Sequence, residues 1–530
     1  MEQPRDQWAT KLGLILAMAG NAIGLGNFWR FPYQAAKFGG GAFMIPYFAA
    51  LFLLGIPVMW IEWVEGRYGG KYGHGTLGPT FYLMARESVK PKTAVIFGMI
   101  GGMLAFSVTS LLNGYYLHIV GWSAAYTYFS ATGAYMNATS TYDFFVSYIK
   151  NTPQVLVFWA ISVGLLGIAV AQGVSKGIER WVKVMMPLLY VAAILLVIRS
   201  LTLGSPVKPE WSSIKGFEYL WEPRFSDVTW ESALAAAGQI FFTLSLGMGI
   251  IQNYASYLGP EDDVALSGLA TVSLNEFAEV ILGGSIAIPI AFAYLGEEGI
   301  KAGVGLAYLA LPNVFMNMVG GRFFGAVWFL LLWFAGFTSA IAMYNYLTAL
   351  LEEDLKINRR VGSAIIFVLY FIIGLPIALD KTLLLLTDLD MWVGSYLLVV
   401  LGLFDIIVGV WLFKPENFWE ELHKGAYIKL PKWIMPIIKY IAPAYVLVLL
   451  GKNTADYLTN GTITMSQKYL EYLVNEEALI STTVEYARKI VMESRAIIIF
   501  VLIIGALEAY MAIKKKYGEE LEKNEVIIRV

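Results

Sequence analysis

The sequence predicts an all-α integral membrane protein with twelve transmembrane helices. Of its 530 residues, 58% are hydrophobic and 15% are charged, whereas soluble domains carry about a quarter charged residues. The mean hydropathy is +0.61. A bilayer core about 30 Å thick is crossed by a helix of about 20 apolar residues, and uncharged runs of that length recur from residue 12 almost to the C-terminus. Nearly the whole chain is therefore expected to lie in the membrane.

Charged or Pro- and Gly-rich breaks divide the hydrophobic runs and set the expected spans. The first run begins at Leu12 and continues without a small-residue cleavage site, so we expect it to remain as a helix and not to be removed as a signal peptide. The expected spans are 12–37, 41–65, 93–125, 154–172, 180–200, 231–257, 263–294, 322–351, 362–379, 383–413, 433–451 and 491–513.

Basic residues mark one side of this arrangement. The connections 66–92 and 173–183 and the segment that follows the last span are rich in lysine and arginine, whereas the connection 129–152 carries few. With twelve spans, the three basic segments fall on the same side of the membrane. The positive-inside rule assigns that side to the cytoplasm, so the expected location is the cell membrane with both termini cytoplasmic.

Several function classes are disfavoured by composition and motifs. A formal net charge of -2 gives no basic field for nucleic acid. The chain has no cysteine, which excludes disulfides and thiolate ligands. The three histidines, His74, His118 and His423, have no carboxylate or histidine partner at metal-binding spacing. A Walker-type phosphate loop is absent, which argues against a nucleotide-driven pump. We expect neither an enzyme nor a nucleotide cofactor.

Two spans are interrupted by glycines and polar residues near the middle of the membrane. In the first span the interruption covers residues 20–27, and in the sixth it covers residues 243–249. Close packing of helices explains a single glycine equally well. It does not explain the amides of Asn21 and Asn27, which are costly in hydrocarbon without partners. Unwound backbone at this depth is tolerated where it is buried in protein or lines a cavity, so the two breaks predict a cavity at mid-membrane.

Short motifs around these breaks resemble the neurotransmitter:sodium symporter family, and in particular its prokaryotic amino-acid transporters. They occur in the family's order along about the whole chain: residues 8–10 (WAT), 20–27, 30–32 (RFP), 39–43 (GGGAF), 238–245 (GQIFFTLS), 274–276 (LNE) and 335–339 (AGFTS). The resemblance implies two inverted repeats of five spans with broken helices 1 and 6, followed by two C-terminal helices.

The same resemblance divides the chain into functional segments. Residues 1–11 are an N-terminal cytoplasmic segment with gate residues, 12–200 and 231–413 are the two repeats, 433–513 hold spans 11 and 12, and 514–530 are a cytoplasmic tail. Transport is expected to occur by alternating access, in which spans 1, 2, 6 and 7 rock against spans 3, 4, 8 and 9.

Two sodium ions are the ligands that the resemblance assigns to the breaks. An unwound helix exposes carbonyl oxygens that a continuous helix would use, and a hard cation prefers oxygen ligands. The implied first site uses Ala22, Asn27, Thr243 and Asn275. The implied second site uses Gly20, Ile23, Ala335, Thr338 and Ser339. For the last two residues the alternative is a pair of hydroxyls bonded back to their own helix.

The first sodium site would be completed by a carboxylate of the substrate, which favours an amino acid. Gly24 stands where monoamine transporters of the family carry an aspartate for the substrate amine. The carboxylate would meet the half-helix N-terminus at Leu25 and Gly26 and the hydroxyl of Tyr116, with Tyr115 as the alternative if the register differs by one. The implied substrate-binding residues are Asn21, Ala22, Leu25, Gly26, Leu112, Tyr116, Phe242, Thr243, Ser245, Met248, Ser339 and Met343. Their apolar members favour a hydrophobic or aromatic amino acid.

Charged residues near the pathway carry the implied gates. Arg30 and Asp390 correspond to the family's extracellular gate. Arg5 and Glu353, with Trp8 and Tyr257, correspond to its cytoplasmic gate. Glu279 stands where chloride-dependent relatives have a serine, and this fixed carboxylate implies independence from chloride.

The expected function is sodium-coupled import of an amino acid. Two alternatives stay open: a transporter-like sensor that binds an amino acid without moving it, and a proton-coupled amino-acid transporter. Gate residues on both faces favour transport. The expected partners are an amino acid and membrane lipid but no nucleic acid, and a homodimer is left open.

Overall fold

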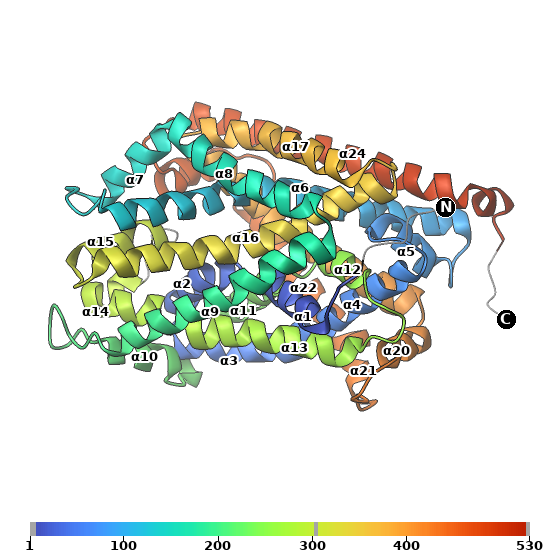
Figure 1. Ribbon diagram of the computed structural model, residues 1–530, viewed down its shortest axis with the longest axis horizontal. Helices are drawn as coiled ribbons and strands as arrows, with labels where there is room; N and C mark the ends of the chain where they lie inside the picture. Colours follow the sequence, from blue (N-terminus) through green and yellow to red (C-terminus); the bar gives the residue numbers. More distant parts are fainter. Residues whose placement is uncertain (1–6, 301–305, 526–530) are drawn as a thin grey trace.

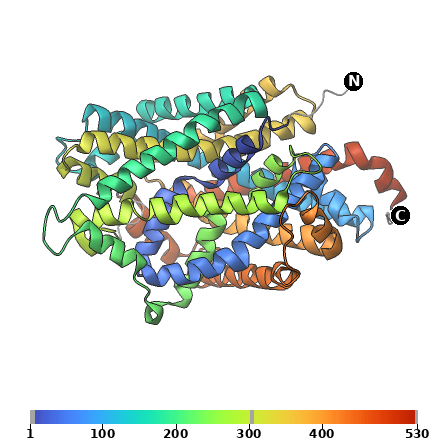
Figure 2. The ribbon, with the colours of Figure 1, turned by 60° about the horizontal axis from the view of Figure 1, so that its bottom comes forward.

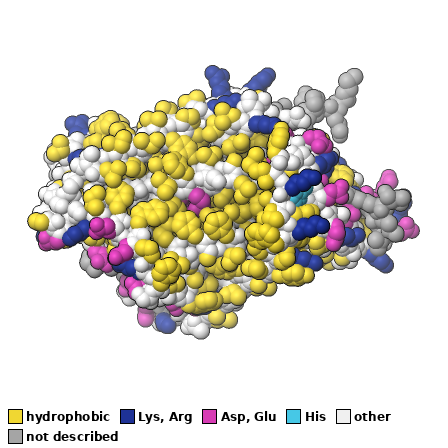
Figure 3. Space-filling model, turned by 90° about the horizontal axis from the view of Figure 1, so that it is seen from below, with side chains coloured by type: hydrophobic (Ala, Val, Ile, Leu, Met, Phe, Trp, Pro, Cys, Tyr) yellow, Lys and Arg dark blue, Asp and Glu magenta, His cyan; other side chains and the backbone are white. Residues whose placement is uncertain are grey.

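The computed structural model describes residues 7–300 and 306–525, and every regular element among them is helical. The long helices run roughly side by side along the longest axis of the molecule, and both termini lie at one end of it (Figures 1 and 2). Hydrophobic side chains cover the middle of the face seen in Figure 3, whereas charged side chains gather at the two ends. This distribution is the one expected for a bundle that crosses a bilayer.

Ten continuous helices in the described chain are long and apolar enough to cross a membrane. They are α3, η2 and α4 (Gly41–Lys71), α6 (Pro91–Thr132), α8 (Thr152–Ala171), η3 and α9 (Val174–Leu201), α13, η5 and α14 (Val264–Glu297), α16 (Gly321–Glu353), α17 (Arg359–Leu379), α18, η7, α19 and η8 (Leu384–Leu412), α21, η9 and α22 (Ile434–Thr459) and α24 (Val484–Lys523).

The remaining two spans are the interrupted ones. The first consists of α1 (Lys11–Ala22), then η1 and α2 (Gly26–Lys37), which are bent by 48° at the break. The other consists of α11 (Trp230–Thr243) and α12 (Ile250–Ala255), separated by residues 244–249. In this gap Ser245, Gly247 and Gly249 have φ values of 57°, 67° and 78°. These left-handed conformations stop helical hydrogen bonding. With α11 and α12 taken as one span, the described residues contain twelve spans, as predicted.

Shorter helices lie at the two ends of the bundle. In Figure 1, α5 (Leu77–Ala85) and α20 (Pro415–His423) lie toward the end with the termini, and α7 (Thr141–Lys150), α10 (Ser213–Trp221) and α15 (Leu311–Asn317) lie toward the opposite end. The other short elements are η4 (Phe225–Asp227), η6 (Leu306–Ala310), α23 (Gln467–Tyr472) and η10 (Leu473–Glu477).

The last span is longer than the sequence suggested. Only its apolar middle, 491–513, was predicted, whereas α24 begins at Val484, after the N-cap Thr483, and ends at Lys523. Its last turns are polar and pack against the end with the termini. There Arg86 of the α5 segment pairs with Glu520, with 2.6 Å between Nη1 and Oε2. Hydropathy detects the part of a helix inside the bilayer and misses an extension that is stabilised by polar contacts.

Candidate substrate and sodium site

The two interruptions lie directly against each other in the middle of the bundle. The Ser245 hydroxyl donates to the carbonyl of Asn21, with 3.0 Å between the oxygens. The hydroxyl of Ser339 on α16 donates to the same carbonyl at 2.9 Å. The Asn21 carbonyl is therefore held by the sixth span and by α16 at once. The predicted meeting of the first span, the sixth span and residues 335–339 is present in the fold.

A chain of neutral polar side chains connects the breaks to α13. The amide nitrogen of Asn27 donates to Oδ1 of Asn275 at 2.8 Å, and the amide nitrogen of Asn275 donates to the Thr243 hydroxyl at 3.2 Å. Oδ1 of Asn27 accepts the backbone N–H of Gly24 at 2.8 Å. All three side chains are buried. The three predicted side-chain ligands of the first sodium site thus come together, and their amide and hydroxyl oxygens suit a hard cation.

One carboxylate stands behind this chain. Glu279 accepts hydrogen bonds from the hydroxyls of Thr243 and Tyr47, the latter at 2.9 Å, and from the amide of Gln239 at 3.0 Å. The Tyr47 hydroxyl also reaches Glu276, at 2.8 Å. Glu279 is buried, so its charge acts at short range on the oxygen cluster. Glu276 belongs to the motif at 274–276 but was not among the predicted site residues.

The predicted second sodium site is assembled in a different way. The Thr338 hydroxyl donates to the carbonyls of Phe334 and Ala335, at 3.0 and 3.1 Å, which is the back-bonded alternative. The Ser339 hydroxyl instead crosses to the first span, where Gly20 presents its carbonyl at 3.5 Å. Ile23 ends α1 with a non-helical ψ of 91°. The residues are neighbours, but the Thr338 hydroxyl would have to rotate in order to face a cation.

A small cavity adjoins these groups. Its volume is about 20 Å³, close to the room that one water molecule needs, so a larger ligand requires side chains to move. The cavity is lined by Ala22, Gly24, Gly26, Leu112, Tyr116, Phe242, Thr243, Ser245, Met248, Ile250, Ser339 and Met343. Ten of the twelve predicted substrate-binding residues are in this set. The other two, Asn21 and Leu25, contribute backbone atoms to the hydrogen bonds described above and below.

Two neighbouring tyrosines of α6 point to different places. The Tyr116 hydroxyl accepts the backbone N–H of Leu25 at 3.0 Å, at the start of the half-helix. The Tyr115 hydroxyl donates to Oδ1 of Asp390 at 2.6 Å. Of the two residues that the sequence left as alternatives, Tyr116 is the one beside the first break. Gly24 lies against it, because a Cβ there would be 2.9 Å from the Tyr116 hydroxyl and 2.7 Å from that of Ser339.

A larger vestibule of about 680 Å³ adjoins the cavity. Its lining includes Tyr142 and Phe145 of α7, a helix that lies toward the end opposite the termini (Figure 1). Tyr116, Phe242 and Gly26 line both spaces and separate them. Arg30 and Asp390 line the vestibule, but within the described chain they form no direct ion pair. The Arg30 guanidinium lies 4.5 Å from the centre of the Phe242 ring, and Asp390 is held by Tyr115. The predicted gate residues are near each other but are bound to aromatic partners.

The end with the termini is closed by other contacts. Trp8 donates its indole N–H to the carbonyl of Tyr254 at 3.1 Å, and its ring lies 6.4 Å from that of Tyr257. Glu353 accepts the backbone N–H of Gly75 at 2.6 Å. Arg5, the predicted partner of Glu353, lies outside the described residues. Sequence reasoning missed Arg359, which binds Glu352 at 2.9 Å, because an arginine at the start of a span reads as an ordinary interfacial residue.

Comparisons with known proteins agree with this arrangement. The profile of the sodium:neurotransmitter symporter family matches residues 5–151 and 145–506. The chain is 34% identical over 382 residues to the sodium-dependent transporter YhdH of Bacillus subtilis, covering 72% of this chain and 80% of that protein. It is 30% identical over 476 residues to the sodium-dependent transporter MJ1319 of Methanocaldococcus jannaschii, covering 86% and 92%.

One solved structure has a similar fold over most of this chain. The crystal structure of MhsT in complex with L-phenylalanine superposes with a TM-score of 0.73 at 28% identity, covering 85% of this chain and 100% of that one. The relatives are transporters and not enzymes, as the sequence predicted. The twelve spans, the two facing breaks and these matches together show that the chain belongs to the sodium:neurotransmitter symporter family of sodium-dependent membrane transporters.

Proposed function

We propose that the protein couples the sodium gradient to the import of an amino acid with a hydrophobic or aromatic side chain. The observation that carries the proposal is the buried chain of Asn27, Asn275 and Thr243, which joins both breaks and offers neutral oxygen atoms beside the cavity. A neutral cage binds sodium best when an anion shares the site. The carboxylate of an amino acid supplies that anion, so sodium and substrate strengthen each other's binding.

The carboxylate of the substrate would bind at the wall of the cavity beside Gly26 and Tyr116. The half-helix begins at Gly26, which lines the cavity, so the positive end of its dipole lies at this wall. The Tyr116 hydroxyl, which accepts from Leu25, still has its own proton to donate to a carboxylate oxygen. Gly24 leaves no room for an acidic side chain at this point. This arrangement favours a ligand that brings its own carboxylate over an amine that lacks one.

The side chain of the substrate would face an apolar wall. Leu112, Phe242, Met248, Ile250 and Met343 line the cavity together. Methionine side chains are flexible and adapt to ligands of different shape, which offsets the small volume of the cavity in this conformation. MhsT, which shares the fold, has been crystallised with L-phenylalanine. An aromatic amino acid is therefore the first substrate to test.

Glu279 supports chloride independence. Its carboxylate is buried against Thr243, a residue of the proposed sodium cage. A fixed negative charge at this distance compensates sodium without a mobile anion. We therefore assign charge compensation to Glu279.

The remaining features of the proposal concern the membrane. We assign the end with the termini to the cytoplasm because the basic connections belong to that side, and the vestibule then opens outward. We further propose two inverted repeats, 12–200 and 231–413, with spans 1, 2, 6 and 7 moving against spans 3, 4, 8 and 9 between outward-open and inward-open states. Two sodium ions per cycle remain a prediction.

Uptake by reconstituted protein tests the proposal. Proteoliposomes with an inward sodium gradient should accumulate radiolabelled L-phenylalanine, and replacing sodium by choline should abolish accumulation. Competition by the other unlabelled amino acids then ranks the substrates. Sodium-dependent binding without accumulation would identify a sensor, and accumulation driven by a pH gradient without sodium would identify a proton symporter. Either result contradicts the proposal.

A further inference from the structure

Three carboxyl groups meet inside the bundle, outside the cavity described above. Glu62 and Glu65 lie one turn apart on α4, and Asp405 lies on α19. Each side chain belongs to a residue with 0% exposure. Ionisable residues inside membrane spans are costly and mark functional sites more often than structural ones. The three residues, called here the acidic triad, come from two separate spans.

The hydrogen bonds of the acidic triad leave half of its oxygen atoms without a donor. Glu62 accepts the backbone N–H of Gly247 at 2.7 Å through Oε1. The amide nitrogen of Gln252 donates to Oε2 of Glu65 at 3.1 Å and to Oδ1 of Asp405 at 3.2 Å. The second oxygen of each carboxyl group is buried and has no donor. Buried oxygen atoms without hydrogen-bond partners are costly. Each of these three oxygen atoms therefore needs a hydrogen atom to accept.

Gln252 provides an independent sign of the missing donors. Its residue is 3% exposed, and its amide nitrogen points into the acidic triad. Its carbonyl oxygen Oε1 is buried and also has no hydrogen-bond partner. An amide oxygen can only accept a hydrogen bond. The Gln252 oxygen therefore lacks a hydrogen-bond donor, as the three carboxyl oxygens do, although Gln252 is not acidic.

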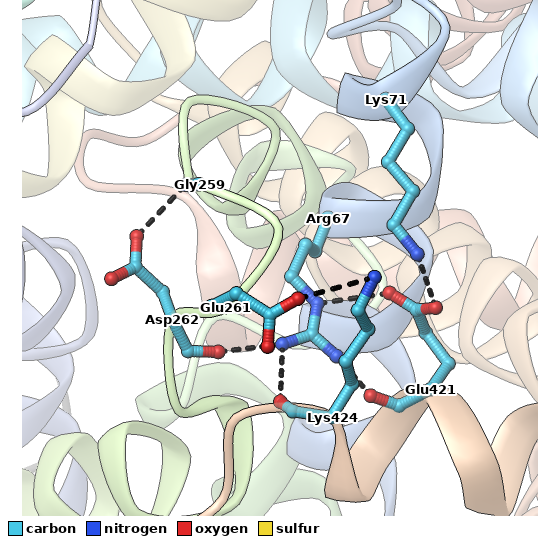
Figure 4. A network of polar contacts seen from close by, with 7 residues as sticks. All are labelled: Arg67, Lys71, Gly259, Glu261, Asp262, Glu421 and Lys424. Carbon is cyan, nitrogen blue, oxygen red and sulfur yellow. Dashed lines mark hydrogen bonds and ion pairs between the residues drawn. The ribbon is translucent and has the colours of Figure 1, made fainter.

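In the described chain, positively charged side chains do not provide the missing donors of the acidic triad. Within the described chain, no lysine, arginine or histidine forms an ion pair with the acidic triad, and the ionisable groups that face Asp405 are the two glutamates. The nearest cation on α4, Arg67, is already engaged. Its Nε donates to Glu421 at 2.9 Å, and its Nη1 donates to the carbonyls of Asp262 and Lys424 at 2.5 and 3.0 Å (Figure 4). Lys71 also pairs with Glu421.

We propose that the acidic triad is a proton-binding site whose number of bound protons changes as the transporter moves between its conformations. Asp405 lies within hydrogen-bonding reach of both glutamates. A proton shared between two carboxyl groups gives each pair the donor it lacks and removes one negative charge. In the present arrangement two shared protons satisfy the three carboxyl groups, and one negative charge remains for the N–H groups of Gly247 and Gln252.

The position of these donors ties the protons to the substrate site. Gly247 lies in the break of the sixth span, and Gln252 lies on α12, directly after it. Gly247 has a φ of 67°, and a Cβ there would lie 1.9 Å from the carbonyl oxygen of Leu398 on α19. The same break carries Thr243 and Ser245 of the site. Any movement of α12 and α4 against α19 separates the carboxyl groups from each other or from their donors, and a separated carboxyl group exchanges its proton with the solvent that reaches it.

The expected movement of α4 and α12, which belong to the moving spans 2 and 6, rests on the proposed function, but the measurement does not require transport. Purified full-length protein in a weakly buffered detergent solution is mixed with sodium chloride, and then with L-phenylalanine, in the presence of a pH indicator dye. Choline chloride corrects for ionic strength. We expect uptake or release of about one proton per molecule, which calibrated additions of acid measure.

Conservative variants assign the protons to the acidic triad. E65Q and D405N keep the size of the side chain but cannot share an acidic proton, so the proton change should fall at least twofold. D388N is the matched control. Asp388 is equally buried and its Oδ2 also lacks a donor, but its Oδ1 accepts from Tyr469 at 3.1 Å and lies 3.8 Å from the Arg495 guanidinium, a positive charge that no residue of the acidic triad has beside it. Its replacement should therefore leave the proton change intact. Gel filtration and sodium-dependent binding establish that each variant is folded.

The outcomes separate this inference from the proposed function. A wild-type protein without a proton change, or E65Q and D405N variants with the full change, would overturn the inference. A proton change in a protein that fails to accumulate amino acids sustains the inference and refutes transport. Infrared difference spectra on sodium addition give a second readout, because the carbonyl band of protonated carboxyl groups should respond in the wild type and be weaker in E65Q.

Discussion

Replacing Tyr116 by phenylalanine tests the centre of the proposed site. The change removes the hydroxyl that accepts the backbone N–H of Leu25 at 3.0 Å and that faces the expected carboxylate. A hydrogen bond to a charged group contributes about 1.5–3 kcal/mol, and a buried donor left unpaired costs about 1–3 kcal/mol. Loss of the carboxylate contact alone should weaken substrate binding by about 10- to 150-fold, since 1.4 kcal/mol corresponds to a factor of ten.

The adjacent tyrosine provides the control. Y115F removes an equivalent hydroxyl from the same helix, but this hydroxyl binds Asp390 in the vestibule at 2.6 Å. Equilibrium binding of radiolabelled L-phenylalanine to purified protein should therefore fall strongly in Y116F and change less than threefold in Y115F. Uptake by Y115F should slow, because Asp390 loses a gate contact. Binding by Y116F with wild-type affinity, or a reversed order of the two variants, would refute the assignment.

Three further predictions concern neighbouring residues. E279S should make sodium-driven uptake depend on chloride, because the variant loses the fixed charge beside Thr243; equal uptake in chloride and gluconate contradicts the charge-compensation role. G24A should reduce substrate binding at least tenfold, since its Cβ would lie 2.7 Å from the Ser339 hydroxyl, whereas G164A, with nothing within 4 Å, should bind normally. T338V should raise the sodium concentration for half-maximal uptake severalfold if the hydroxyl rotates to a cation; an unchanged sodium dependence means that it only bonds back to its helix.

The breaks of the first and sixth spans could be predicted because they disturb a strong local signal. A hydropathy run of fixed length is expected in a membrane helix, and glycine and asparagine within it are costly unless the backbone serves a purpose. The side chains of Asn27, Thr243 and Asn275 were predicted as sodium ligands from motifs in a fixed order. The structure brings these three together within hydrogen-bonding distance.

The contacts that the sequence did not predict depend on tertiary packing. Arg30 lies over the ring of Phe242, and no local pattern distinguishes this contact from a direct ion pair with Asp390. The acidic triad joins residues of α4 to one of α19, and each of them taken singly reads as an isolated charge in a span. Such a cluster cannot be recognised in the sequence because its members lie far apart along the chain, whereas hydropathy and helical periodicity describe only residues that are close in sequence.

The thin wall between the vestibule and the cavity has a consequence for the speed of each step. On the vestibule side, Phe242 and Tyr116, together with Gly26, separate the two spaces. Phe242 is only partly buried, so its ring can rotate within picoseconds to nanoseconds once a contact of about 1 kcal/mol with Arg30 is released. At the end with the termini, Trp8 and Glu353 bind backbone atoms of Tyr254 and Gly75. Opening there moves whole segments, which takes microseconds to milliseconds. A ligand should therefore enter and leave the cavity from the vestibule side many times before the protein opens at the end with the termini.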